Sequence, residues 1–246
     1  MVQVVRGRAE TPAADRAVTA ELLDWTADTG LSGVRVWQPH RQVAFGRRDT
    51  RAESYQQARA AASERGFEPT ERRVGGRAVA YTGRTLAIAH TVPIDDVREG
   101  LCDRYKTTSG TLLDVLDELG ADVTRGEPAD AYCPGSHSLS SVDEAGDPAA
   151  KLAGIAQRVQ SGAALVAACL TVRQDDVEEL QDVLVPVYQS VGVDFEPETV
   201  GSVETAGGPS DIGVVAQAIE NALVDGRRRS CKTLETRVGV RSYDRE

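Results

Sequence analysis

The sequence predicts an α+β fold: a central mixed, largely antiparallel sheet with helices on its flanks. Three observations support this class. Segments with apolar residues at helical spacing alternate along the chain with short segments of strand type. Glycine, proline and aspartate separate many of these segments, which is typical of turn-linked strands. The chain has 246 residues, enough to bury a large core.

The elements are expected in a definite order. Thr11-Pro12 is a helix start and Gly30 a helix stop, so the first helix is expected between them. A last helix is expected after Ser210, which we predict to be its cap. The charged segment from residue 225 onward has too weak a pattern for any assignment. Between the first and last helices we expect strands at 34–36 and 43–45, a helix at 53–65, a strand at 86–92, a helix within 95–120, a hairpin within 130–160, a strand at 162–172 and a helix at 175–192.

The stretch from 130 to 160 contains the strongest candidates for catalytic residues. Cys133 stands in a Tyr-Cys-Pro-Gly turn, and a hairpin turn is expected at Gly146-Asp147-Pro148, followed by Lys151 among small apolar residues. A thiol beside an ammonium combines a nucleophile with a group that stabilises charge or moves a proton. The register of this hairpin does not place Cys133 opposite Lys151. We therefore expect them to meet only if the loop before the first strand folds back.

A second motif is the arginine-glycine segment from Arg72 to Val79. Glycines let backbone N–H groups approach a ligand, and arginine side chains suit carboxylate or phosphate groups. The alternative interpretation is a plain hairpin turn with solvated arginines.

Composition excludes several classes of protein. The net charge of −10 argues against broad nucleic-acid binding, which needs a basic surface. Only three of the 28 basic residues are lysines, which favours a halophilic source, although a GC-rich genome also favours arginine. The spacing of the four cysteines and three histidines predicts neither a disulfide framework nor a metal site.

No apolar run reaches the roughly 20 residues that span a bilayer, and no signal peptide is evident at the N-terminus. A cytoplasmic location is therefore expected. We predict two parts of the chain: a catalytic domain at residues 1–192, and a C-terminal helical segment with a tail at residues 193–246.

The order of the motifs resembles the superfamily of lipoate and biotin protein ligases and lipoyl or octanoyl transferases. The resemblance covers roughly residues 13–190. It rests on Arg35-Val36-Trp37 with Phe45-Gly46-Arg47, then Arg72 to Val79, then Lys151 to Arg158. It implies a fold similar to biotin and lipoate ligases and class II synthetases. The Tyr-Cys-Pro-Gly turn is most similar to the cysteine-dependent octanoyl/lipoyl amidotransferase branch, and the acidic composition to a haloarchaeal-type member of the lipoate–protein ligase A family.

The resemblance also implies roles for individual residues. Cys133 would carry the acyl group as a thioester, and Lys151 would bind or polarise the acyl carbonyl. Two positions depart from the family pattern. Arg77 stands where the family motif has its third glycine, and Ala167-Ala168 stand where ATP-dependent ligases typically have a different pair. These departures favour acyl transfer over the use of ATP. The residues predicted to surround the acyl group are Arg72, Arg73, Gly75, Gly76, Arg77, Ala78, His90, Gly154, Gln157 and Arg158.

The predicted activity is transfer of an octanoyl or lipoyl group to a specific lysine of a lipoyl carrier domain, such as glycine cleavage H protein or a 2-oxoacid dehydrogenase E2. That reaction would need no cofactor beyond the acyl group itself. One alternative is a lipoate–protein ligase that uses ATP and Mg²⁺ and acts through a lipoyl-adenylate. An alternative of another class is a non-catalytic module that binds lipoyl groups or their carriers.

Overall fold

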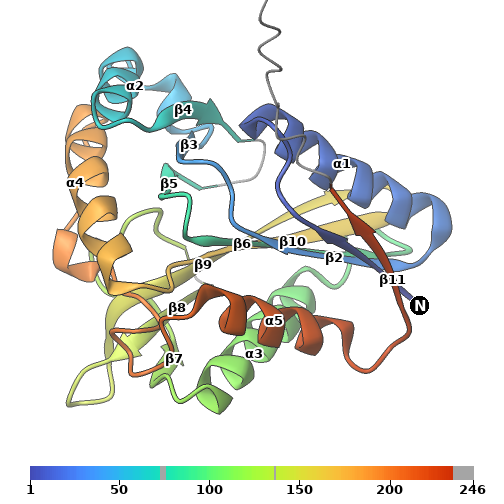
Figure 1. Ribbon diagram of the computed structural model, residues 1–246. Helices are drawn as coiled ribbons and strands as arrows, with labels where there is room; N and C mark the ends of the chain where they lie inside the picture. Colours follow the sequence, from blue (N-terminus) through green and yellow to red (C-terminus); the bar gives the residue numbers. More distant parts are fainter. Residues whose placement is uncertain (73–75, 136, 235–246) are drawn as a thin grey trace, which may run out of the picture.

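The computed structural model describes residues 1–72, 76–135 and 137–234. Its largest element is an eight-stranded sheet (Figure 1). The strands of this sheet are β1 (Val2–Arg6), β2 (Ser32–Trp37), β6 (Leu86–Pro93), β7 (Val123–Arg125), β8 (Ser138–Val142), β9 (Pro148–Gln160), β10 (Ala163–Leu170) and β11 (Arg229–Thr233). They lie in the order β11-β1-β2-β6-β10-β9-β8-β7. β1 runs parallel to β2 and β11, and every other neighbouring pair is antiparallel, which confirms the predicted mixed, largely antiparallel sheet.

A smaller sheet lies beside the large one. It contains β3 (Gln42–Phe45), β4 (Glu68–Glu71) and β5 (Val79–Tyr81) in the order β4-β3-β5. The helices α2 (Tyr55–Glu64) and α4 (Gln174–Ser190) pack on it, and they share one hydrophobic core with β3 and β5. Arg72 directly follows β4, and Arg77 and Ala78 directly precede β5, so this small sheet fixes the position of these residues.

The first helix, α1 (Pro12–Thr29), has the predicted limits. The Thr11 hydroxyl accepts a hydrogen bond from the Ala14 N–H, Pro12 occupies the first turn, and Gly30 ends the helix in the left-handed conformation with φ +68°. α1 covers one face of the large sheet (Figure 1).

The opposite face of the large sheet is covered by α3 (Leu101–Glu118) and α5 (Ile212–Val224) (Figure 1). Large aliphatic side chains fill this layer, including Leu86 and Ile88 from β6, Leu116 from α3 and Ile219 from α5. We call this side of the sheet the core face, and the side under α1 the pocket face.

Two expectations about the chain ends need correction. The segment after residue 225 contains a strand, β11, which pairs in parallel with β1 at the other end of the chain. Neither strand was expected, because a parallel pair between the two ends of a chain leaves no local pattern of turn residues. The last helix is capped by the Asp211 carboxylate, which accepts from the N–H groups of Gly213 and Val214, and not by Ser210.

The C-terminal part of the described chain packs closely with the rest. Val215, Ile219 and Leu223 of α5 belong to the same core as Leu86 of β6. The division of the chain at residue 192 stays a prediction. Among the helices of the described residues, none has the length and apolar character needed to cross a membrane.

Candidate functional site

Cys133 lies in the loop between β7 and β8 in a strained backbone conformation. Its φ is +45°, in the left-handed region that residues other than glycine rarely adopt. Its sulfur accepts hydrogen bonds from the Arg72 guanidinium (Nη2–Sγ 3.0 Å) and from the Arg77 backbone N–H (N–Sγ 3.3 Å). Strain of this kind persists where surrounding contacts fix the backbone. The loop therefore presents a thiol to two hydrogen-bond donors.

Tyr188 of α4 connects this loop to the arginine-glycine segment. Its hydroxyl accepts from the Cys133 N–H (2.5 Å) and donates to the Ala78 carbonyl (2.9 Å). Burial raises the pKa of Tyr188 well above its ordinary value, so the hydroxyl keeps the proton that it donates. A helix distant in sequence thus fixes the position of Cys133 relative to Ala78.

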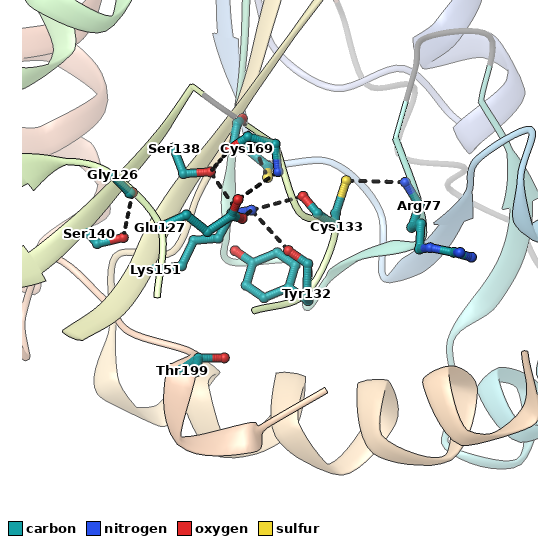
Figure 2. A network of polar contacts seen from close by, with 12 residues as sticks. Arg77, Gly126, Glu127, Tyr132, Cys133, Ser138, Ser140, Lys151, Cys169 and Thr199 are labelled. Carbon is teal, nitrogen blue, oxygen red and sulfur yellow. Dashed lines mark hydrogen bonds and ion pairs between the residues drawn. The ribbon is translucent and has the colours of Figure 1, made fainter. Parts of the chain in front are cut away.

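Lys151 reaches the Cys133 loop from β9 and is completely buried. Its ammonium donates to the carbonyl oxygens of Tyr132 (2.9 Å) and Cys133 (3.0 Å) and pairs with Glu127 (Figure 2). In the strand ladder Lys151 stands opposite Ser140, so the contact with Cys133 exists because the loop folds back. The ammonium has three N–H groups, and each has a partner here. In this arrangement Lys151 anchors the loop.

Glu127 sits at the start of the same loop. Its carboxylate pairs with Lys151, accepts from the Ser138 hydroxyl (3.3 Å), and accepts from the Gly135 N–H (2.6 Å). Ser140 bonds to the adjacent Gly126 carbonyl (3.0 Å), as Figure 2 shows. Several polar contacts therefore close the loop on itself.

A pocket of about 440 Å³ lies on the pocket face, under α1. This volume is typical of sites for small molecules. Several of the strand residues that line it are small, among them Ala87, Gly154, Ala156 and Ala167, and Ile88 and Ala168 of the core cluster also border it. The lining includes Arg16, Thr19, Leu23, Trp37, Arg72, Tyr81, Ala87, Gly154, Ala156, Arg158, Leu165, Ala167 and Cys169.

Arg72 links the pocket to the thiol. It lines the pocket and also donates to the Cys133 sulfur. Burial acts to lower the pKa of the Arg72 guanidinium, but the neighbouring Cys133, Tyr81 and Cys169 together act in the opposite direction, so that the pKa is raised. Arg72 therefore stays charged at the junction of pocket and thiol.

The predicted acyl-binding residues divide into separate groups. Arg72, Gly154 and Arg158 line the pocket. Gly76 and Arg77 lie next to the thiol: Gly76 has φ +97°, and a Cβ atom added there would come within 2.6 Å of the Cys133 sulfur. Ala78 is fully buried and contributes its carbonyl to Tyr188. The predicted Arg73 and Gly75 lie outside the described residues.

His90 and Gln157 lie elsewhere, and their placement argues against the predicted acyl-binding role. Gln157 bonds to Arg104 (2.7 Å) and to the Leu101 carbonyl (3.1 Å), so it faces α3 on the core face. His90 follows Ile88 by two positions on β6 and shares the core face with it. Burial, aided by the nearby charge of Arg227, lowers the pKa of His90 to about 4. Gln157 and Gly154 differ by an odd number of positions, so the two positions face opposite sides of β9.

Cys169 is a second thiol on the pocket, and its environment contrasts with that of Cys133. Burial raises the pKa of the Cys169 thiol, which keeps it protonated and weakly nucleophilic. Cys102 and Cys231 are exposed. Within the described ranges, no group of three or more His, Cys, Asp and Glu side chains is arranged to hold a metal ion.

The sequence reasoning missed Glu127 and Tyr188. Neither residue stands in a motif, and both reach the site through the tertiary fold. A partial signal for the pocket was present in the small residues Gly154, Ala156 and Ala167 of the strand-type segments.

Comparisons with curated proteins point to acyl transferases. The chain is 28% identical over 179 residues to an octanoyl-[GcvH]:protein N-octanoyltransferase of Exiguobacterium sp., a match that covers 70% of this chain and 61% of the relative. It is 33% identical over 135 residues to the protein of the same name in Anoxybacillus flavithermus, covering 54% and 46%. A lipoyl-[GcvH]:protein N-lipoyltransferase of Listeria monocytogenes is 28% identical over 129 residues, covering 52% and 44%. The matched segments thus span about half to three fifths of these relatives.

Solved structures share the fold. A lipoate-protein ligase A solved with bound ATP superposes with a TM-score of 0.71 at 18% identity, covering 95% of this chain and 88% of that chain. A bipartite lipoate protein ligase from Thermoplasma acidophilum, studied with its E2 lipoyl domain, gives a TM-score of 0.67 at 17% identity, covering 95% and 87%. These likenesses confirm the lipoate-ligase-like architecture expected from the motifs.

The family model of the lipoyl protein ligase A/B catalytic domain matches residues 11–224. This match includes Cys133, Lys151, the arginine-glycine segment and every strand that borders the pocket. The chain belongs to the lipoyl protein ligase A/B catalytic domain family.

Proposed function

We propose that this chain transfers an octanoyl or lipoyl group to a specific lysine of a lipoyl carrier domain through a thioester on Cys133. The observation that carries the proposal is the position of the Cys133 sulfur, which the Arg72 guanidinium connects to the pocket. The printed names of the curated relatives, which describe octanoyl or lipoyl transfer from GcvH to protein, support the same reaction class.

The proposed reaction has two balanced steps. The Cys133 sulfur attacks the acyl carbonyl of the donor, a carbon–sulfur bond forms, and the bond between the acyl group and the donor lysine nitrogen breaks as that nitrogen takes the proton that the thiol gives up. The lysine amine of the acceptor domain then attacks the thioester carbonyl. An amide forms, the carbon–sulfur bond breaks, and the proton that the amine loses goes to the departing sulfur, which regenerates the Cys133 thiol. One amide replaces another, so no external energy source is needed.

The residues around the thiol have distinct roles in this proposal. Arg72 and the Arg77 N–H stabilise negative charge on the sulfur while it is the nucleophile and again when it is the leaving group. Lys151 holds the loop through the Tyr132 and Cys133 carbonyls. For Lys151 also to polarise the acyl carbonyl, one of its three N–H groups must exchange a loop carbonyl for the substrate oxygen.

The pocket would hold the acyl chain. Its floor runs along β9 from Gly154 near the Lys151 side chain to Arg158, with Leu23 of α1 and Leu165 of β10 on the walls. An extended acyl tail that starts at the thiol would lie between these apolar walls, where burial of its methylene groups contributes about 0.8 kcal/mol each.

The alternative is an ATP-dependent lipoate–protein ligase. Arg16, Arg72 and Arg158 line the pocket, and guanidinium groups of this kind bind phosphate, so the residues present are compatible with a nucleotide. Bound ATP would activate the carboxyl group of a free acid, and Mg²⁺ would accompany it. Cys133 would then have no chemical role, so Cys133→Ser would remain active.

The test is intact-protein mass spectrometry after incubation with an octanoylated carrier domain and no ATP. The proposal predicts an added octanoyl mass that hydroxylamine removes and that Cys133→Ser abolishes. Absence of the adduct, with acylation of the carrier domain once free octanoate, ATP and Mg²⁺ are supplied, would establish the ligase instead.

We further propose that the reaction takes place in the cytoplasm of a halophilic cell. The support is the net charge of −10 with only three lysines. On this proposal both the unfolding temperature and the transfer rate rise when KCl is increased from the millimolar to the molar range. A steady fall in both would contradict it.

A further inference from the structure

The carboxylate of Glu127 joins the beginning of the Cys133 loop to its end. One oxygen pairs with the Lys151 ammonium and accepts from Ser138 (Figure 2). The other oxygen accepts from the Gly135 N–H at 2.6 Å. Glu127 precedes Cys133 by six positions and Gly135 follows it by two. A single side chain therefore spans the segment that carries the thiol.

Lys151 and Glu127 depend on each other. The Lys151 side chain is 1% exposed and that of Glu127 is 16% exposed, so water screens their interaction little. Within the described residues Glu127 is the one acidic side chain that forms an ion pair with Lys151. Removal of the carboxylate would leave a buried cation without a counter-charge, a strongly unfavourable state.

Through Lys151 this pair controls the backbone at Cys133. The ammonium binds the carbonyl oxygens of both Tyr132 and Cys133, which belong to the two peptide planes on either side of the Cys133 Cα atom. The orientation of these two planes sets φ and ψ of Cys133, including its φ of +45°. That conformation directs the sulfur at Arg72 and at the Arg77 N–H.

We propose that Glu127 is a positioning residue for Cys133: it holds Lys151 and the Gly135 N–H so that the loop presents the sulfur to Arg72. The proposal rests on the proposed role of Cys133 as the nucleophile and names a residue on which its reactivity depends. Glu127 itself touches neither the sulfur nor the pocket in this arrangement.

The test compares E127Q, K151M and the double variant E127Q/K151M with the wild-type chain. The readout is the rate of alkylation of Cys133 by iodoacetamide, followed by peptide mass spectrometry. The exposed Cys102 and Cys231 of the same molecule are internal references. S140A is the matched control, because it removes the bond to the Gly126 carbonyl and leaves the Glu127 carboxylate with its partners. The unfolding temperature is measured for every variant.

We expect E127Q to slow Cys133 alkylation by about tenfold or more, because the sulfur leaves its two donors. Cys102 and Cys231 should react as in the wild type, and S140A should leave Cys133 unchanged. The double variant has no unpaired buried charge and should regain the wild-type unfolding temperature, while its Cys133 stays slow.

A purely structural role of Glu127 predicts that the double variant regains both stability and Cys133 reactivity, and that result would overturn the proposal. A folded E127Q chain with unchanged or faster Cys133 alkylation would also overturn it. The double variant keeps the test decisive if E127Q alone does not fold. Alkylation needs only the thiol, so the outcome is independent of whether the chain forms an octanoyl thioester.

Discussion

The two faces of the large sheet are built from the same strands but have different roles: one forms the hydrophobic core and the other borders the pocket. On the core face β6 presents Leu86 and Ile88, which are buried against α3 and α5. On the pocket face the intervening positions of β6, β9 and β10 carry small residues such as Ala87, Ala156 and Ala167. One side is filled by large side chains, and the other leaves a pocket of about 440 Å³.

The difference shows how one alternating pattern supplies both stability and a binding site. Side chains of a strand point alternately to its two faces, so a strand that reads large-small-large-small packs densely on one side and leaves space on the other. The chemical groups lie where this space ends, at Arg72 and the Cys133 loop. Substitutions on the two faces should therefore have separable effects.

The largest expected effect is at the chemical end of the pocket. Lys151→Ala should remain folded and lose transfer activity by about 10²–10³-fold, because the loop that carries Cys133 loses its anchor and any charge stabilisation by the ammonium. Turnover of purified protein, with circular dichroism for the fold, checks this. Lys106→Ala, at an exposed lysine of α3, is the control. Near-wild-type turnover of Lys151→Ala would show that Lys151 has no role in the transfer reaction.

The next largest effect is on the core face. Leu86→Ala, on β6, should lower the free energy of unfolding by about 2–5 kcal/mol, because it leaves a cavity among fully packed side chains. Denaturant unfolding measures the loss. Turnover per folded molecule should stay near the wild-type value, since the side chain belongs to the core layer. A large drop in turnover per folded molecule would show that the core face and the pocket face do not have separate roles.

A smaller effect is expected on the pocket face, where an alanine of β10 and an alanine of β9 form a matched pair. Ala167→Leu fills part of the pocket and should weaken octanoyl transfer by about tenfold or more. Ala153 of β9 belongs to the core cluster and not to the pocket lining, so Ala153→Leu should instead destabilise the fold by about 1–3 kcal/mol. Turnover and unfolding of both variants are compared. Equal effects of the two substitutions on turnover would contradict the division into faces.

The smallest expected effect is a pH dependence of stability on the core face. The folded pKa of His90 is about 4, below the usual 6.5, because burial disfavours the charged ring. The neutral ring thus contributes stability that is fully present above about pH 6.5 and is lost as the pH falls toward 4. His90→Leu should lose less stability than the wild type between pH 7 and pH 4.5. Identical pH profiles of the two proteins in denaturant unfolding would refute this.

Most elements of the fold were predictable because they leave local patterns. Thr11-Pro12 and Gly30 mark α1, and the turn at Gly146-Asp147-Pro148 separates β8 from β9. β1 and β11 were not predictable, because their parallel pairing joins the two ends of the chain. The three-residue strand β7 is too short for a periodic signal.

The site was predictable where it depends on motifs and not where it depends on tertiary contacts. Cys133, Lys151 and Arg72 were singled out from the sequence, and the structure places all three around one loop. Glu127 and Tyr188 enter through contacts between distant segments, which no spacing reveals. Gln157 was grouped with Gly154 by closeness in sequence, although the twofold period of a strand puts the two on opposite faces.

The fate of an octanoyl group on Cys133 distinguishes a reaction intermediate from an incidental adduct. The octanoyl-loaded chain is isolated without ATP and mixed with a carrier domain that has an unmodified lysine, and both masses are followed in time. If the Cys133 thioester is the intermediate, the octanoyl mass leaves Cys133 at the rate at which the carrier gains it. A carrier that becomes acylated while the Cys133 adduct persists, or an adduct located on another residue, would contradict it.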